Sequence, residues 1–94
     1  MKIEGIIWLE AIIEKLAVKH SVEPYEVEEA LENSPKIRFA KKGDRQGEDV
    51  YIALSQTDAG RYLAVLFIHK INRDALIISA RDMATKERKQ YGRK

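Results

Sequence analysis

The chain has 94 residues, of which 45% are apolar and 34% are charged, and its formal net charge is +2. This length suits one small domain spanning residues 1–94, with a single modest core. The absence of cysteine excludes disulfides and thiolate chemistry, and two histidines far apart in sequence argue against a zinc site. No apolar run approaches the ~20 residues of a membrane span, and the first residues lack a signal-peptide pattern, so we expect a soluble cytoplasmic protein.

The first third of the chain predicts two helices. Apolar residues recur with helical spacing from Ile6 to Ala17, which predicts a helix over about 7–20. Pro24 is a poor helix continuer but a good first-turn residue, so a second helix should run over about 24–33. The first few residues are compatible with an additional edge strand, and their pattern does not decide the matter.

The apolar period then changes to two, which predicts strands. Successive runs predict four of them, over about 36–41, 49–55, 61–69 and 75–80. The third run is apolar on both faces and is expected to be central. Asp82 suits the N-cap of a terminal helix that runs to about Tyr91.

These elements predict an α+β fold. The short connections between the strands favour an antiparallel meander. The predicted architecture is therefore two N-terminal helices packed on a four-stranded antiparallel meander, followed by a short C-terminal helix.

Charge is distributed unevenly along the chain. Residues 1–35 hold three basic and eight acidic side chains, a net charge of −5, whereas residues 36–80 carry +3 and residues 81–94 carry +4. Such polarity can direct a phosphate-rich or acidic partner to one face. The alternative is a small soluble domain that simply carries charge on its helices.

The run IISARDMATKERKQY, residues 77–91, is the most informative segment. A strand delivers Arg81 at its end, and a short basic helix follows at once. A guanidinium fixed by a strand end loses less entropy on binding than one on a free loop, so Arg81 is a good phosphate ligand. The alternative is a salt bridge from Arg81 to Asp82, Glu87 or the acidic helices.

Three further side chains could support acid–base or phosphate chemistry. His20 ends the first helix and could transfer protons, or could be a histidine favoured by the helix dipole. Glu48 could be a general base or an ordinary loop carboxylate. Arg61 could bind phosphate or be a surface residue beside a turn. Antiparallel pairing predicts that Arg61 and Arg81 lie at one end of the sheet and Glu48 at the other.

Aromatic side chains offer a second kind of contact. Tyr51, Tyr62 and Tyr91 could stack on nucleic-acid bases. As single residues they could equally be half-buried packing. The sequence shows no metal-binding, phosphate-loop, dinucleotide or catalytic-triad motif, so we expect no metal and no other cofactor.

Three blocks of sequence resemble the BrnT family of RelE-like ribonuclease toxins. They are Lys19 to Val22 with the acidic helix 26–31; residues 47–54 followed by 60–65; and Ile78 to Arg81 with residues 84–85, 87–88 and 91. The third block is the most specific. The other two occur in the right order and spacing, so the resemblance covers most of the chain.

The resemblance implies a RelE-like fold and a cytoplasmic prokaryotic toxin that cleaves RNA without a metal. In such enzymes the 2′-hydroxyl attacks the adjacent phosphate while an acid protonates the leaving 5′-oxygen. Carried onto this chain, His20 or Glu48 serves in acid–base roles, and Arg61 and Arg81 bind the phosphate. The RNA-binding residues expected around them are Lys19, Tyr51, Arg88 and Tyr91.

The family also implies a partner, an antitoxin of the BrnA type that covers the toxin. That antitoxin binds operator DNA, so the toxin would meet DNA only through the complex. We expect no membrane partner.

The chain departs from the family pattern in its first helix. Many members carry an acidic residue, a lysine and an asparagine where this chain has Leu9, Ile12 and Leu16, and Ser21 replaces the usual glycine. The more apolar helix indicates better packing, a changed partner surface or weakened catalysis. An inactive module that binds an antitoxin is therefore the alternative to a toxin, and a plain RNA-binding domain is a third hypothesis.

Overall fold

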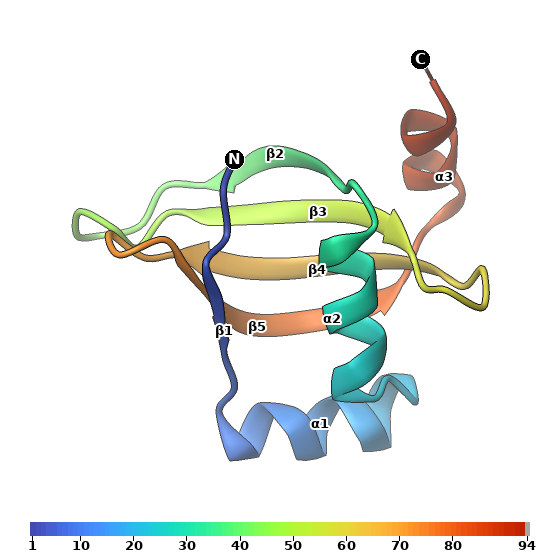
Figure 1. Ribbon diagram of the computed structural model, residues 1–94, viewed down its shortest axis with the longest axis horizontal. Helices are drawn as coiled ribbons and strands as arrows, with labels where there is room; N and C mark the ends of the chain where they lie inside the picture. Colours follow the sequence, from blue (N-terminus) through green and yellow to red (C-terminus); the bar gives the residue numbers. More distant parts are fainter. Residues whose placement is uncertain (94) are drawn as a thin grey trace.

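The computed structural model describes residues 1–93 as three helices and one five-stranded sheet (Figure 1). In chain order the elements are β1 (Gly5–Ile7), α1 (Glu10–His20), α2 (Pro24–Glu32), β2 (Lys36–Lys41), β3 (Val50–Gln56), β4 (Tyr62–His69), β5 (Asp74–Asp82) and α3 (Thr85–Gly92). The predicted α+β class is confirmed.

The sheet is mixed, with the strand order β1-β5-β4-β3-β2. Strands β2 to β5 are antiparallel neighbours, whereas β1 pairs in parallel with β5. The predicted four-stranded antiparallel meander is therefore wrong, because Gly5–Ile7 adds a fifth, parallel strand. Because β1 includes residue 7, the first helix begins at Glu10 instead of residue 7.

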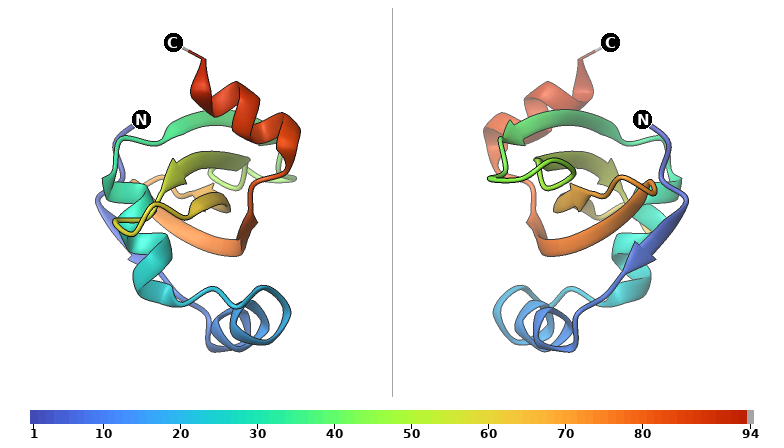
Figure 2. Two further views of the ribbon diagram at one scale, coloured as in Figure 1. Left: turned by 90° about the vertical axis from the view of Figure 1, so that its right-hand side faces the viewer. Right: turned by 90° about the vertical axis from the view of Figure 1, so that its left-hand side faces the viewer.

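The helices are also arranged differently from the predicted two-helix layer. Helix α1 packs against β5, and α2 lies against β3 and β4. Because β1 lies beside β5 and only two residues separate β1 from α1, α1 must begin at that edge of the sheet. Figure 2 shows α2 and α3 on opposite sides of the sheet.

Each face of the sheet has its own apolar cluster. On the side of α1 and α2, the main cluster joins helix residues such as Leu16 and Val27 to Phe67 and Ile77. The opposite side, which we call the α3 face, carries a smaller cluster that includes Ile52, Leu54, Ala64 and Met83. Because Met83 lies between β5 and α3, it anchors that helix over one end of the α3 face.

The altered residues of the first helix mostly contribute to the core. Leu16 is 1% exposed, and Ile12 packs against the main cluster. Leu9 differs, because it is half exposed at the N-cap of α1 and its side chain makes no capping hydrogen bond. Two of the three positions therefore place apolar side chains in or against the core.

Helix α3 does not use its predicted cap. Its N-cap is Ala84, whose N–H donates to the Glu87 carboxylate at 2.8 Å. The prediction that Asp82 caps this helix is wrong, because Asp82 is the last residue of β5 and its carboxylate accepts a hydrogen bond from Arg61.

Candidate functional site

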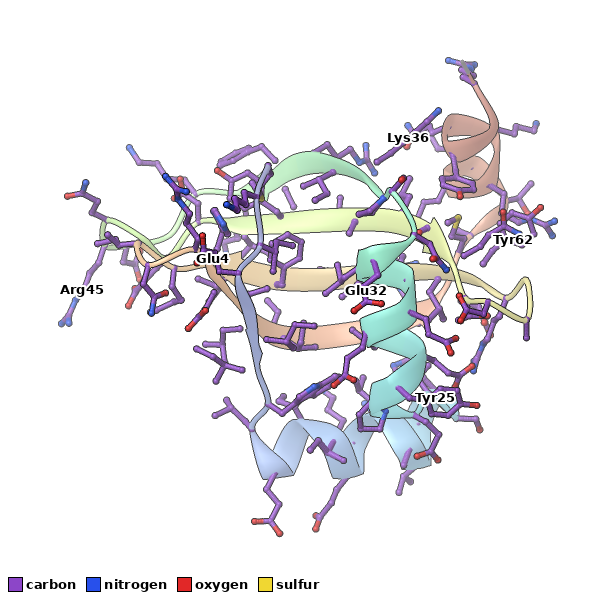
Figure 3. The ribbon with its side chains drawn as sticks, in the orientation of Figure 1. Glu4, Tyr25, Glu32, Lys36, Arg45 and Tyr62 are labelled. Atoms are coloured by element: carbon purple, nitrogen blue, oxygen red, sulfur yellow. The ribbon has the colours of Figure 1, made fainter. Side chains whose placement is uncertain are left out.

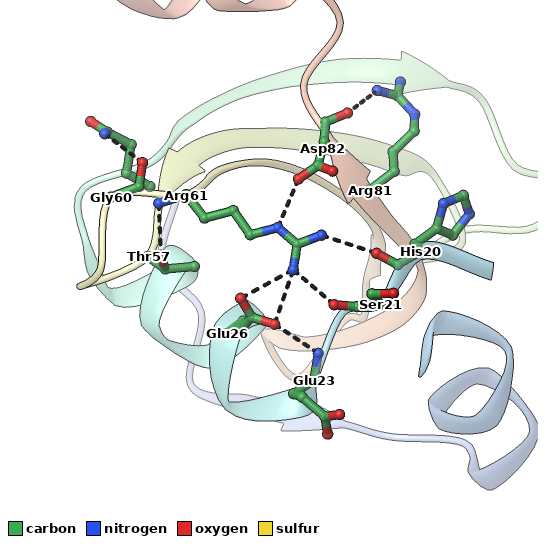
Figure 4. Close-up of polar contacts among 10 residues, drawn as sticks. His20, Ser21, Glu23, Glu26, Thr57, Gly60, Arg61, Arg81 and Asp82 are labelled. Atoms are coloured by element: carbon green, nitrogen blue, oxygen red, sulfur yellow. Dashed lines mark hydrogen bonds and ion pairs between the residues drawn. The ribbon is translucent and has the colours of Figure 1, made fainter. Parts of the chain in front are cut away.

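The guanidinium of Arg61 joins three parts of the fold (Figure 4). Its Nε donates to Asp82 Oδ1 at 2.7 Å, at the end of β5. Its Nη1 donates to the carbonyl of Ser21 at 2.8 Å and to the two Glu26 carboxylate oxygens at 3.1 and 3.2 Å. Its Nη2 donates to the carbonyl of His20 at 3.0 Å. Arg61 therefore links the start of β4 to β5, to α2 and to the α1–α2 connection.

Local backbone geometry creates these acceptors. Ser21 ends α1 in the left-handed region, with φ 52°, where glycine is favoured. The last carbonyls of a helix lack intrahelical partners, and Arg61 satisfies two of them at His20 and Ser21. Glu26 is held in turn, because it accepts a hydrogen bond from the backbone N–H of Glu23 at 3.0 Å.

The charges at this junction stabilise one another. The hydrogen bond from Arg61 holds the pKa of Asp82 below its ordinary value, and the nearby His20 adds a smaller effect in the same direction. The hydrogen bonds to Asp82 and then to Glu26 raise the pKa of Arg61 against the opposing effect of burial. Both groups therefore remain charged at neutral pH.

Arg81 lies on the α3 face of the sheet. It pairs in register with Ala64, whereas the next residue, Asp82, pairs with Leu63, and consecutive strand residues point to opposite faces. Two N–H groups of Arg81 bind the Glu87 carboxylate oxygens at 2.6 and 2.9 Å. The predicted salt-bridge alternative is thus present, and hydrogen bonding from Arg81 is the largest cause of the lowered pKa of Glu87.

Arg81 nevertheless retains free donors. A guanidinium has five N–H groups, and Arg81 uses Nη1 and Nη2 on Glu87 and Nη1 on the carbonyl of Asp82 at 3.3 Å. Within residues 1–93 no acceptor binds its Nε. The Arg81 side chain is 37% exposed, so part of it is open to solvent.

Acid should weaken the contribution of Glu87 to stability. Its pKa is lower in the folded chain than its ordinary value of 4.5, so its contribution is complete above that value and is lost as pH falls through the folded pKa. We expect urea unfolding midpoints to fall progressively below pH 4.5, and to fall less in Glu87→Gln. The exposed Glu32→Gln is the control and should follow the wild type. An equal acid loss in Glu87→Gln and the wild type would contradict this assignment.

The candidate acid–base residues are separated along the sheet. His20 lies beside Arg61, Asp82 and the end of β5 (Figure 4). Glu48 precedes β3 at the opposite end, where Val50 pairs with Ile68. The prediction that Glu48 and Arg61 lie at opposite ends is confirmed.

The ring of Tyr51 packs against neighbouring aromatic side chains. Its ring stacks on Phe67 with centroids 6.0 Å apart, and its edges contact Phe39 and His69. It points to the side of α1 and α2, away from Arg81, since it pairs in register with Phe67.

The basic and aromatic residues of α3 form a second surface. Arg88 lies 4.0 Å from the ring centre of Tyr62, and Tyr62 meets Tyr91 edge to face. A shallow pocket there is lined in part by Gln56, Tyr62, Arg88 and Tyr91. Figure 3 shows Tyr62 and Lys36 near α3, and Arg45 at the far end of the sheet. Lys19 is exposed in the last turn of α1.

Sequence reasoning found only part of what holds the two arginines. Glu87 was expected only as an alternative salt-bridge partner of Arg81, and the contact of Glu26 with Arg61 was missed. Each carboxylate lies three residues after a helix N-cap, which is a capping signal that could have drawn attention to both. Arg38 was also missed. Its alternation with Lys36 in a strand was the available signal, since it places both side chains on one face.

Two kinds of feature are absent from the part of the chain that the structure describes. Residues 1–93 contain no group of three or more His, Asp or Glu side chains that could hold a metal ion. No helix within this range is long and apolar enough to cross a membrane.

Comparison with known proteins identifies one family. A family model described as a ribonuclease toxin, BrnT, of a type II toxin–antitoxin system matches residues 8–87. The matched range runs from the residues just before α1 into α3, and it contains His20, Arg61 and Arg81. A search of curated proteins found no match.

Proposed function

Because this chain belongs to the BrnT family of type II toxin–antitoxin ribonuclease toxins, we propose that it arrests growth by cleaving RNA in the cytoplasm without a metal ion. We also propose that its fold is RelE-like. The observation that carries the proposal is Arg81, held by Glu87 on the α3 face with an unused Nε donor. A positioned guanidinium of this kind suits a phosphate on which negative charge increases.

In the proposed reaction the RNA supplies its own nucleophile. The 2′-hydroxyl loses its proton to a base and attacks the adjacent phosphorus, and the bond from phosphorus to the 5′-oxygen breaks. The leaving 5′-oxygen takes a proton from an acid. The products are a 2′,3′-cyclic phosphate and a 5′-hydroxyl. Arg81 stabilises the additional charge on the phosphate oxygens.

His20 is the better supported acid–base residue in this proposal. It lies at the same end of β5 as Arg81, whereas Glu48 lies at the other end of the sheet. Arg61 then acts as a positioning residue, because the acceptors around its guanidinium include the carbonyl of His20 and the carboxylate of Asp82. Its contacts fix the end of α1 relative to β5.

The remaining residues contribute to RNA binding in this proposal. Lys19 and Arg88 add positive charge, and Tyr91 offers a ring beside Tyr62 for base stacking. Tyr51 has no part in it, since its ring is packed against Phe67 and Phe39. The family implies an antitoxin partner, and we propose a BrnA-like protein that covers the toxin and brings it to DNA.

Expression of the chain in bacteria tests the proposal. Induction should arrest growth, and co-expression of a small antitoxin encoded beside it should restore growth. A tight complex without toxicity would support the inactive interaction module instead. RNA binding with steep salt dependence, but without cleavage, would favour the plain RNA-binding domain.

A further inference from the structure

We infer that Arg38 is a second phosphate-binding residue, which acts with Arg81 to hold single-stranded RNA across the α3 face from β5 to β2. The identity of this ligand rests on the proposed function. The location of the binding site is inferred from three observations: the strand register, the lack of an ion-pair partner for Arg38, and a shallow pocket beside α3.

Strand register places Arg38 and Arg81 on the same face. Arg38 pairs with Ile52, which pairs with Leu66, which pairs with Ser79. Ser79 and Arg81 are two residues apart on β5, so their side chains share a face. The two arginines thus stand on β2 and β5. They are separated by three strand spacings of about 4.8 Å, or roughly 14 Å, across the sheet and by two residues along it, with an apolar floor between them.

The two arginines share one neighbouring carboxylate, Glu87. It accepts two hydrogen bonds from Arg81, and the charge of Arg38 is the smallest of the effects that lower its pKa. A phosphate chain that crosses the α3 face from β5 to β2 would therefore meet Arg81 and then Arg38.

Arg38 is also available. It is exposed, and within residues 1–93 no carboxylate lies within ion-pairing distance of it. The neighbouring Lys36 is engaged, because its Nζ donates to the carbonyls of Gln90 and Arg93 at the end of α3. Arg38 lines a shallow pocket between β2 and α3 together with Lys36, Leu54 and Gln90. Within residues 1–93, Arg38 is thus the cation of this pocket whose donors have no hydrogen-bond acceptor.

Binding of a non-cleavable RNA tests the inference. The probe is a single-stranded 2′-O-methyl oligoribonucleotide, which lacks the attacking hydroxyl, and its Kd is measured by fluorescence anisotropy at several salt concentrations. We expect Arg38→Ala to raise Kd about tenfold at low salt and to reduce the slope of log Kd against log salt by about 0.7, the value for one phosphate contact on a single strand.

Two variants make the test specific. Lys41→Ala removes a positive charge from the same strand, at the end of β2 where Lys41 pairs with Val50, far from α3. This variant should leave the slope unchanged. Arg38→Lys should restore the slope, because it restores the charge. Equal Kd and slope for Arg38→Ala and Lys41→Ala would overturn the inference, as would a wild type that does not bind the probe.

Cleavage assays separate this inference from the proposed function. If the wild type binds the probe through Arg38 but leaves unmodified RNA intact, the inference stands and the ribonuclease proposal fails. If the wild type cleaves RNA and Arg38→Ala changes neither the Kd nor the slope for the probe, the inference fails and the ribonuclease proposal stands.

Discussion

Replacement of Arg81 by alanine is expected to lower the rate of RNA cleavage about 10²- to 10³-fold, the usual effect of removing one donor that stabilises transition-state charge. The loss should appear mainly in kcat, because the charge on the phosphate increases in the transition state. Single-turnover cleavage of an end-labelled RNA measures it directly.

Two variants control for indirect effects of this change. Arg81→Lys should recover little activity, because an ammonium cannot reproduce the two-point contact with Glu87 that orients the guanidinium. Arg45→Ala removes an exposed arginine in the loop at the far end of the sheet and should cleave like the wild type. If Arg81→Ala cleaves RNA at the same rate as the wild type, Arg81 does not belong to the catalytic site.

Replacement of Arg61 by alanine is expected to destabilise the fold by about 2–3 kcal/mol. Hydrogen bonds to charged groups contribute about 1.5–3 kcal/mol each, and partial exposure of the Arg61 side chain reduces their combined effect. Such a loss lowers the Tm of a small domain by roughly 10–20 °C. Urea denaturation with Arg45→Ala as the control measures it.

The Arg61 variant also separates two roles. Arg61 is 26% exposed and has acceptors on β5, on α2 and at the end of α1, so its removal should loosen His20 and lower cleavage indirectly. An Arg61→Ala protein with wild-type stability but no cleavage would contradict this positioning role. That result would indicate that Arg61 binds the phosphate directly, which is one of the interpretations of the sequence.

Local patterns predicted most of the elements. The two-residue period identified β2 to β5. The turn between β3 and β4 closes through a hydrogen bond from the Gly60 N–H to the Thr57 carbonyl at 2.9 Å. Strand β1 was left undecided because three residues carry little pattern. Its existence depends on pairing Gly5 with Asp74, which is a contact distant in sequence.

The site was only partly predictable for a similar reason. Arg81 stood out because a strand and a basic helix meet there. The extensive hydrogen bonding of Arg61 could not be seen in the sequence, since two of its acceptors are backbone carbonyls at His20 and Ser21, which any sequence would supply. The face occupied by Arg38 follows only from the register of β2 with β3.

Cleavage of RNA by the purified protein in the presence of EDTA tests the central claim most directly. The proposal predicts cleavage fragments that end in a 2′,3′-cyclic phosphate, resistance of a substrate with 2′-deoxyribose at the cleaved position, and strong loss of cleavage in Arg81→Ala. Intact RNA, or residual cleavage that is equal in the wild type and Arg81→Ala, would contradict it.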